Sequence, residues 1–173
     1  MHLLLLKYSV EDNAHRGKYK TKPNRAVTTN ADGSLRVIFN TTEPSYVNKE
    51  MTEILDWVNL QLKLKKLHPL IIVGLFVYEF LSIHPFQDGN GRLSRLLSSL
   101  LLIKFGYKWI QYVSFEHEIE NRKVEYYQEL RKCQAQRPGE EITTWIFFFF
   151  DVLINIQNQL IAKLNTQGIE SSL

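Results

Sequence analysis

The stretch from His84 to Arg95 concentrates groups that can do chemistry, and it lies between two strongly apolar segments. It reads His84-Pro85-Phe86-Gln87-Asp88-Gly89-Asn90-Gly91-Arg92-Leu93-Ser94-Arg95. Gly89-Asn90-Gly91 predicts a turn that leads into a helix, where consecutive backbone N–H groups and the helix dipole attract anions. Two glycines in this turn would let phosphate oxygens approach the backbone closely.

Charged side chains on both sides of that turn complete a set suited to phosphate chemistry. Arg92 and Arg95 are three residues apart, so they share one helix face and could bind more than one phosphate. One carboxylate, here Asp88, commonly holds Mg²⁺ together with phosphate oxygens and water. His84 is suited to taking a proton from an attacking hydroxyl. Each residue alone has a structural alternative, as a cap, a turn or a solvated face, but together they are the parts of phosphoryl-type transfer.

Two helices must position this stretch. Residues 70–81 are apolar on nearly every face, which predicts a buried helix that begins at Pro69 and ends before Pro85. A leucine stripe with helical spacing predicts a second helix that ends near Gly106. The stripe consists of Leu93, Leu96, Leu97, Leu100 and Leu101.

The rest of the chain is predicted to be helical except for a loop over residues 9–25 and one β-hairpin. The hairpin spans residues 26–40, with its turn at Asn30-Ala31-Asp32-Gly33, because Asp-Gly favours tight turns. Further helices are expected from Pro44 to Leu62, along Ile119, Val124, Tyr127 and Leu130, and from about Ile142 to Asn165. The predicted fold class is mostly α, a helical bundle that carries one β-hairpin.

The composition limits the classes of protein to consider. Of the 173 residues, 45% are hydrophobic and 23% charged, which is typical of a soluble globular domain. Cys133 is the one cysteine, which excludes an intrachain disulfide and a multi-cysteine zinc site. A net charge of +3 is too small to favour nucleic acid. The apolar run from Trp145 is interrupted at Asp151, short of the roughly 20 residues of a membrane span, which predicts a core helix. We expect a cytoplasmic protein with no membrane or nucleic-acid partner.

The chemical stretch resembles the signature of the Fic family, His-Pro-Phe-x-(Asp/Glu)-Gly-Asn-Gly-Arg-x-x-Arg, at every fixed position. Ser82-Ile83 before it, and Gly106-Tyr107 and Tyr126-Tyr127 after it, are also similar to the family core. The resemblance covers most of residues 1–160. It implies a Fic core domain over residues 1–165, with a hairpin flap at about 26–40 and a catalytic loop at 84–92. Residues 166–173 would form a C-terminal tail.

The resemblance implies a Mg²⁺-dependent protein adenylyltransferase, which transfers AMP from ATP to a Ser, Thr or Tyr hydroxyl of a target protein and releases pyrophosphate. His84 would be the general base, and Asp88 would hold Mg²⁺ between the α- and β-phosphates. Gly89, Asn90 and Gly91 would cradle the phosphates, with Asn90 near the α-phosphate. Arg92 would contact the β-phosphate and Arg95 the γ-phosphate, while Phe86 would anchor the loop in the core.

Three further expectations concern the transferred group, the adenine and the target protein. In the branch of the family that transfers phosphate, a lysine replaces the glycine found here at Gly91, so Gly91 favours AMP transfer. Tyr127 and Gln134, together with Tyr126, could flank the adenine, although both tyrosines could equally be core aromatics. The target protein would pair with the hairpin by strand addition, and the alternative is a hairpin that only covers the bundle.

Regulation and alternative functions stay open at this point. Many family members carry an inhibitory helix, (Ser/Thr)-x-x-x-Glu-(Gly/Asn), whose glutamate pairs with the second motif arginine, here Arg95. Thr166 and Glu170 have that spacing, but Ser171 follows them, and a frayed tail is the alternative. Such a helix could instead lie in a missing flank or on another protein. The alternative functions are transfer of UMP or phosphate, removal of AMP, and a non-catalytic nucleotide- or protein-binding module, which would have no need of His84 beside Asp88.

Overall fold

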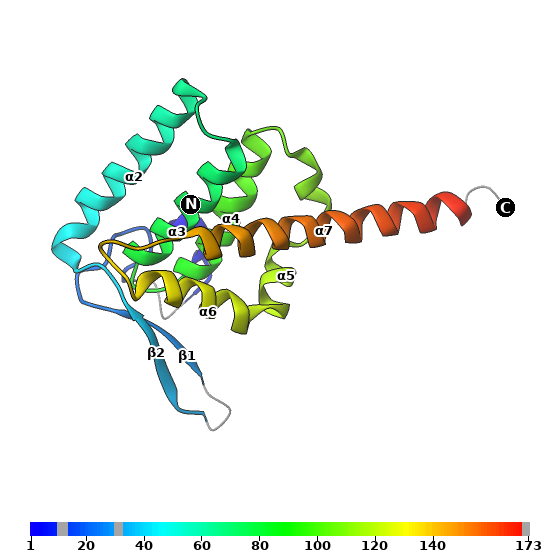
Figure 1. Cartoon of the computed structure of the whole chain (residues 1–173). Helices are drawn as coiled ribbons and strands as arrows, with labels where there is room; N and C mark the ends of the chain where they lie inside the picture. Colours follow the sequence, from blue (N-terminus) through cyan, green and yellow to red (C-terminus); the bar gives the residue numbers. More distant parts are fainter. Residues whose placement is uncertain (10–13, 30–32, 171–173) are drawn as a thin grey trace.

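The computed structural model describes residues 1–9, 14–29 and 33–170, and most of them are helical (Figure 1). In chain order, the elements are α1 (His2–Leu5), β1 (Arg25–Thr29), β2 (Leu35–Asn40), α2 (Pro44–Leu64), α3 (Pro69–Ile83), α4 (Asn90–Lys104), the 3₁₀ helix η1 (Lys108–Tyr112), α5 (Phe115–Asn121), α6 (Lys123–Gln134) and α7 (Thr143–Glu170). The predicted mostly α class is confirmed.

Helix α3 is the centre of the bundle, as its uniformly apolar sequence predicts. It packs against α2, α4 and α7, and ten of its residues are buried. Gly74 allows α7 to come close, because a Cβ at this position would lie 2.8 Å from Ile146 Cδ1. The indole N–H of Trp145 then donates to the Gly74 carbonyl at 2.9 Å. This contact fixes α7 across the middle of α3.

The sequence predicts one continuous helix along Ile119–Leu130, and this prediction is wrong. The chain forms two helices, α5 and α6, which meet at Arg122. Ser114 starts α5, since its hydroxyl accepts a hydrogen bond from the His117 N–H at 3.1 Å. Val124, which the periodicity placed in the core, is 83% exposed, and Tyr126 is buried instead. The break at Arg122 changes the phase of the apolar face, and a single 3.6-residue pattern cannot follow that change.

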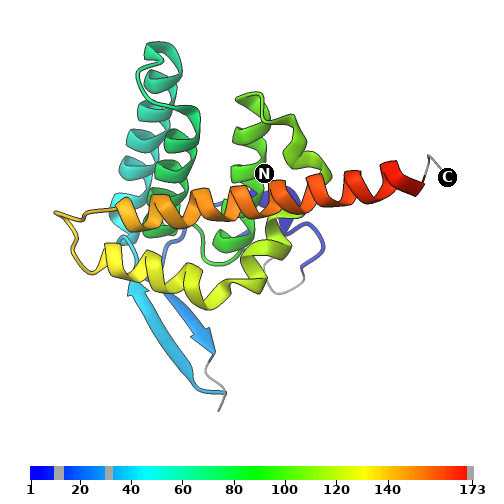
Figure 2. The ribbon, with the colours of Figure 1, turned by 45° about the vertical axis from the view of Figure 1, so that its right-hand side comes forward.

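Helix α7 continues past the expected end at Asn165 to Glu170. Gly168 costs only about 1 kcal/mol relative to alanine inside a helix and does not end it. By length and composition alone the stretch Thr143–Thr166 could cross a membrane, although Asp151 interrupts its apolar run. In the structure, one side of this helix packs on the core through Trp145, Phe148, Phe149, Val152, Leu153 and Ile156. Its last turns project beyond the bundle (Figure 2).

Strands β1 and β2 pair antiparallel and extend away from one end of the bundle (Figure 1). Arg25 lies opposite Asn40, and a bulge interrupts the register between Ala26 and Val27. Of the expected turn at 30–33, residues 30–32 lie outside the described residues. The hairpin thus begins at Arg25, and its second strand leads into α2.

Candidate active site

The stretch singled out in the sequence forms the connection between α3 and α4. His84 ends α3 in the left-handed conformation, with φ 53° and ψ 59°. Gly89 has φ 78°, which glycine adopts without strain, and α4 begins at Asn90. The chain therefore reverses sharply at both ends of a five-residue loop. This brings His84, the candidate base at the end of α3, close to the backbone N–H groups at the start of α4.

A cavity of about 360 Å³ lies over this loop and the first turns of α4. Its lining consists of Arg25, Leu81, His84, Gln87, Asp88, Gly89, Asn90, Gly91, Arg92, Arg95, Tyr127 and Leu130. Of the residues predicted to contact ATP, Mg²⁺ or the target hydroxyl, all except Tyr126 and Gln134 are among them. The volume falls in the range of small-ligand sites.

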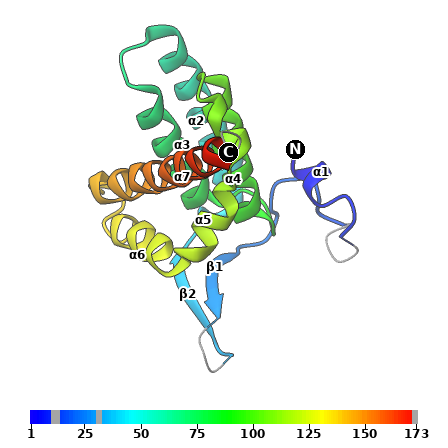
Figure 3. The same ribbon diagram turned by 90° about the vertical axis from the view of Figure 1, so that its right-hand side faces the viewer.

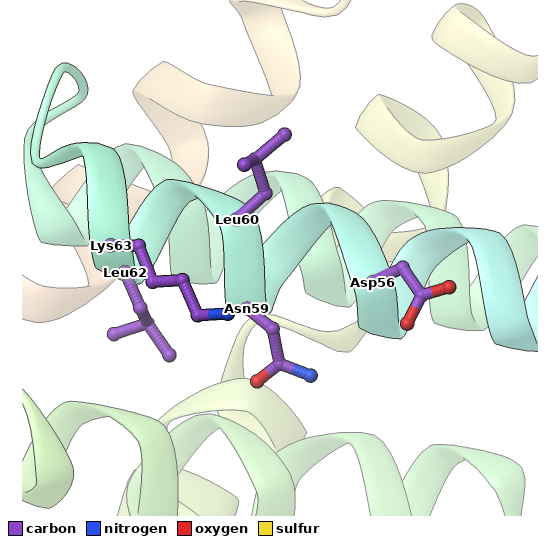
Figure 4. A pocket seen from close by; sticks show the side chains of 5 residues that line it. All are labelled: Asp56, Asn59, Leu60, Leu62 and Lys63. Carbon is purple, nitrogen blue, oxygen red and sulfur yellow. The ribbon is translucent and has the colours of Figure 1, made fainter.

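A larger hollow of about 670 Å³ runs along α2, far from these groups in the sequence (Figure 4). All five residues that line it come from α2, and its charged members are Asp56 and Lys63. A ligand site gathers polar groups from several elements around one point. The cavity over the loop meets that description, and the hollow along α2 does not.

His84 is held as a neutral ring. Burial, and after it the positive charge of Lys20, lower the pKa of His84 to about 4, against the opposing effects of the Leu81 carbonyl and Asp88. Its Nδ1 lies 3.3 Å from the Leu81 carbonyl oxygen, which can only accept, so Nδ1 carries the hydrogen. Nε2 is then the basic nitrogen, and it is unprotonated at neutral pH.

Asn90 uses its side chain to close the loop. Its Oδ1 accepts from the Phe86 N–H at 2.9 Å, and its Nδ2 donates to the Phe86 carbonyl at 2.7 Å. The side chain is buried, and the oxygen and the nitrogen of its amide each make one of these bonds. Phe86 is itself buried, in agreement with its predicted role as an anchor.

Both arginines of the stretch are paired with carboxylates. Arg92 Nη2 donates to Asp88 Oδ2 at 2.9 Å, and both side chains are about half exposed, so the pair is weak. Arg95 is only 13% exposed and binds both carboxylate oxygens of Glu116, in the first turn of α5. A Cβ at position 91 would lie 3.2 Å from Arg95 Nη1, which gives a spatial reason for Gly91.

The carboxylate that binds Arg95 in the structure is that of Glu116. The sequence had offered Glu170 as a candidate for this role. The helix end that carries Glu170 projects past the bundle (Figure 1). No motif distinguishes Glu116 from the other acidic residues of α5, and its contact with Arg95 spans 21 residues. Only the packing of α5 against α4 brings the two together.

Asp88 could hold a divalent cation only with help from a ligand. Its carboxylate is 60% exposed at the cavity rim. Within residues 1–9, 14–29 and 33–170, no three His, Cys, Asp or Glu side chains gather as a metal site. Mg²⁺ prefers six oxygens and keeps several waters, so one carboxylate with phosphate oxygens and water fits it.

Of the three residues expected near the adenine, the structure brings one to the cavity. Tyr127 lines it. Tyr126 is a core aromatic, packed edge-on against Trp145 and Phe148, so the core alternative holds for it. Gln134 donates to the Ser82 hydroxyl beside α3 and is not among the lining residues.

The N-terminal segment also supports the loop, and no feature of the sequence predicted this. His2 stacks on Phe86 with ring centroids 3.8 Å apart, and its Nε2 lies 2.9 Å from the Asp88 carbonyl. Asn24 Nδ2 donates to the Phe86 carbonyl at 2.8 Å. Helix α1, which carries His2, lies at the edge of the molecule on the α4 side (Figure 3). The separations of 62 and 86 residues leave no local pattern from which these contacts could be predicted.

Comparisons with known proteins agree with the signature. A sequence profile described as the Fic/DOC family matches residues 1–102. "Protein adenylyltransferase fic-1" of Caenorhabditis elegans is 35% identical over 69 residues, which are 40% of this chain and 13% of that protein. "Protein adenylyltransferase Fic" of Drosophila willistoni is 48% identical over 52 residues, which are 30% of this chain and 10% of that protein.

A solved structure extends the similarity to almost the whole chain. A Fic family protein from Desulfovibrio desulfuricans G20 superposes with a TM-score of 0.75 and 26% identity, over 94% of this chain and 45% of that one. A Fic domain containing signaling protein from Bacteroides thetaiotaomicron VPI-5482 superposes with a TM-score of 0.56 and 29% identity, over 84% of this chain and 50% of that one. This chain thus spans at most about half of these relatives.

Proposed function

The chain belongs to the Fic/DOC family, and from that premise we propose that it transfers AMP from ATP to a hydroxyl group of a target protein. One observation carries the proposal. A single cavity gathers a neutral histidine, one exposed carboxylate, the N-terminus of α4 and two arginines. A non-catalytic nucleotide site has no use for a histidine held neutral beside the phosphate-binding groups.

His84 is the proposed general base. Nε2 takes the proton of a Ser, Thr or Tyr hydroxyl as the oxygen forms a bond to the α-phosphorus of ATP. The bond from that phosphorus to the bridging oxygen breaks, and pyrophosphate leaves with its electron pair. The low pKa of His84 keeps the ring unprotonated, so the base is available without a prior proton transfer.

The start of α4 is the proposed phosphate site. The backbone N–H groups from Gly89 onward point along the helix axis toward an anion. Arg92 would bind the β-phosphate and Arg95 the γ-phosphate, each after exchanging its carboxylate partner for phosphate oxygens. Asp88, once released from Arg92, would hold Mg²⁺ against the phosphates. When bound, Mg²⁺ neutralises charge on the phosphate oxygens and on the departing pyrophosphate.

The remaining parts of the cavity suit the two ends of the reaction. Tyr127, with Leu81 and Leu130, offers an aromatic and apolar surface for the adenine. Arg25 lines the same cavity and begins β1, so an extended peptide paired with the hairpin would run toward His84. Both edges of this two-stranded sheet lack a neighbouring strand in the part of the chain that the structure describes. We also infer a cytoplasmic setting, where ATP is abundant and the buried Cys133 stays reduced.

Label transfer tests the proposal. The protein is incubated with Mg²⁺, a cell lysate and ATP labelled at either the α- or the γ-phosphate. Label that reaches protein from the α position alone supports AMP transfer, and label from the γ position alone would mean phosphate transfer. His84→Ala should lower the rate by about 10³-fold. His117→Ala is the matched control, since His117 is exposed on α5 and outside the cavity. Absence of label from both positions would favour a binding module.

A further inference from the structure

We propose that Lys20 is a positioning residue for His84. Lys20 forms hydrogen bonds with the backbone on both sides of this base. The role rests on the proposed function, in which His84 accepts the proton. Lys20 belongs to the stretch predicted as a loop, and neither its spacing nor its neighbours single it out. Its burial does, because only 4% of it is exposed. Lysine is rarely this buried without a carboxylate partner.

The contacts of Lys20 flank His84 directly. The Lys20 backbone N–H donates to the Pro85 carbonyl at 2.9 Å, and the ammonium Nζ donates to the Ile83 carbonyl at 3.2 Å. One residue therefore holds the carbonyls immediately before and after the base. His84 is in the left-handed conformation, which is strained for a residue with a side chain and persists only where its surroundings enforce it. Lys20 supplies part of that enforcement.

The ammonium group is satisfied by neutral oxygens. Besides the Ile83 carbonyl, Nζ donates to Asn24 Oδ1 and Thr41 Oγ1, both at 2.8 Å. Three acceptors match its three hydrogens. Asn24 passes the constraint on, because its Nδ2 donates to the Phe86 carbonyl. A buried charge without a direct counter-ion is costly. If residue 20 only filled space, an apolar or neutral side chain would do so at a lower desolvation cost.

The charge of Lys20 also acts on the base. It is one of the groups that lower the pKa of His84, after burial, while Asp88 acts in the opposite direction. Burial lowers the pKa of Lys20 itself to about 8, and the nearby Glu43 and Glu50 oppose that shift. Lys20 is therefore mostly charged at neutral pH, and it favours the unprotonated, basic form of His84.

Lys20→Met tests the role, with Lys18→Met as the matched control, because Lys18 is an exposed lysine of the same segment. We expect kcat for AMP transfer to fall about 30-fold in Lys20→Met, since small displacements of a catalytic group are costly. KM for ATP should stay within about threefold, because the phosphate contacts on α4 are not touched. Lys20→Arg, which keeps the charge and the donors, should recover most of the rate.

An NMR titration of the His84 imidazole supplies a readout that does not need activity. In Lys20→Met the midpoint should rise by about one pH unit, because a neighbouring positive charge is lost. Lys18→Met should leave the midpoint unchanged. If wild-type protein transfers no label, the proposed function fails, and this titration still decides whether Lys20 acts on His84.

An unchanged kcat together with an unchanged His84 midpoint in folded Lys20→Met would overturn the proposal. If Lys20→Met does not fold, Thr41→Val replaces it, since this variant keeps the lysine and removes one acceptor of its ammonium. It should lower kcat about threefold, with the midpoint of His84 displaced. Wild-type values for both quantities in Thr41→Val would then refute the role.

Discussion

The two halves of the stretch from His84 to Arg95 are held in different ways. Around His84 and Phe86, hydrogen bonds between backbone groups and Lys20, Asn24 and Asn90 fix the chain in place. On the other half, the charged side chains of Asp88, Arg92 and Arg95 are held by ion pairs with one another or with Glu116. The proposed base is thus built in advance, while the phosphate-binding charges are stored in pairs that a substrate must exchange. We therefore expect the first half to govern chemistry and folding, and the second to govern the affinity for ATP.

The burial of His84, in the first half, should make the free energy of unfolding depend on pH. The ordinary pKa of a histidine, 6.5, applies to the unfolded chain, and burial lowers it to about 4 in the folded protein. Between these values the unfolded chain binds more protons, so the free energy of unfolding falls as the pH is lowered. The loss from His84 should be about 3 kcal/mol between pH 7 and pH 4.

Urea denaturation of wild type and His84→Asn over this pH range measures the difference. Asparagine tolerates the left-handed conformation, so the variant isolates the titration. The slope of wild type should exceed that of His84→Asn, and His117→Ala should behave as wild type. Parallel curves for wild type and His84→Asn would mean that His84 is not buried as a neutral ring.

The loop closure should depend on Asn90. In Asn90→Ala the buried Phe86 N–H loses its acceptor, which should cost about 2 kcal/mol of unfolding free energy. The rate of AMP transfer should fall with it, because His84 and α4 are joined through this loop. Thermal denaturation measures the first effect and label transfer the second. Asn59→Ala, at an exposed amide on α2, is the control. Equal stability of the two variants would contradict the role of Asn90 in closing the loop.

Local patterns predicted one part of this molecule, and long-range packing determined the other. The burial of α3, the start of α4 and the signature residues follow from hydrophobicity, proline and glycine, which act over a few residues. The break at Arg122 and the contacts of Lys20 and Glu116 depend on segments that meet only after folding. Chemistry-bearing types were recognisable at His84 and Arg95, whereas Lys20 and Glu116 are ordinary surface types until their burial or partner is known. The sequence therefore predicts most of the residues that line the cavity, but not the contacts that hold them in place.

In the half that carries the ion pairs, the substitution Glu116→Gln should change the affinity for ATP. The amide keeps the shape of the side chain but removes the negative charge that holds Arg95, so a phosphate no longer competes with a carboxylate. We expect ATP to bind about fivefold more tightly, which is about 1 kcal/mol, as measured by calorimetry in the presence of Mg²⁺. Glu53→Gln, which removes an exposed charge paired with Lys49 on α2, should leave the affinity unchanged. Weaker binding in Glu116→Gln would instead mean that Glu116 orients Arg95 toward the phosphate, and the two halves of the loop would then be equally built in advance.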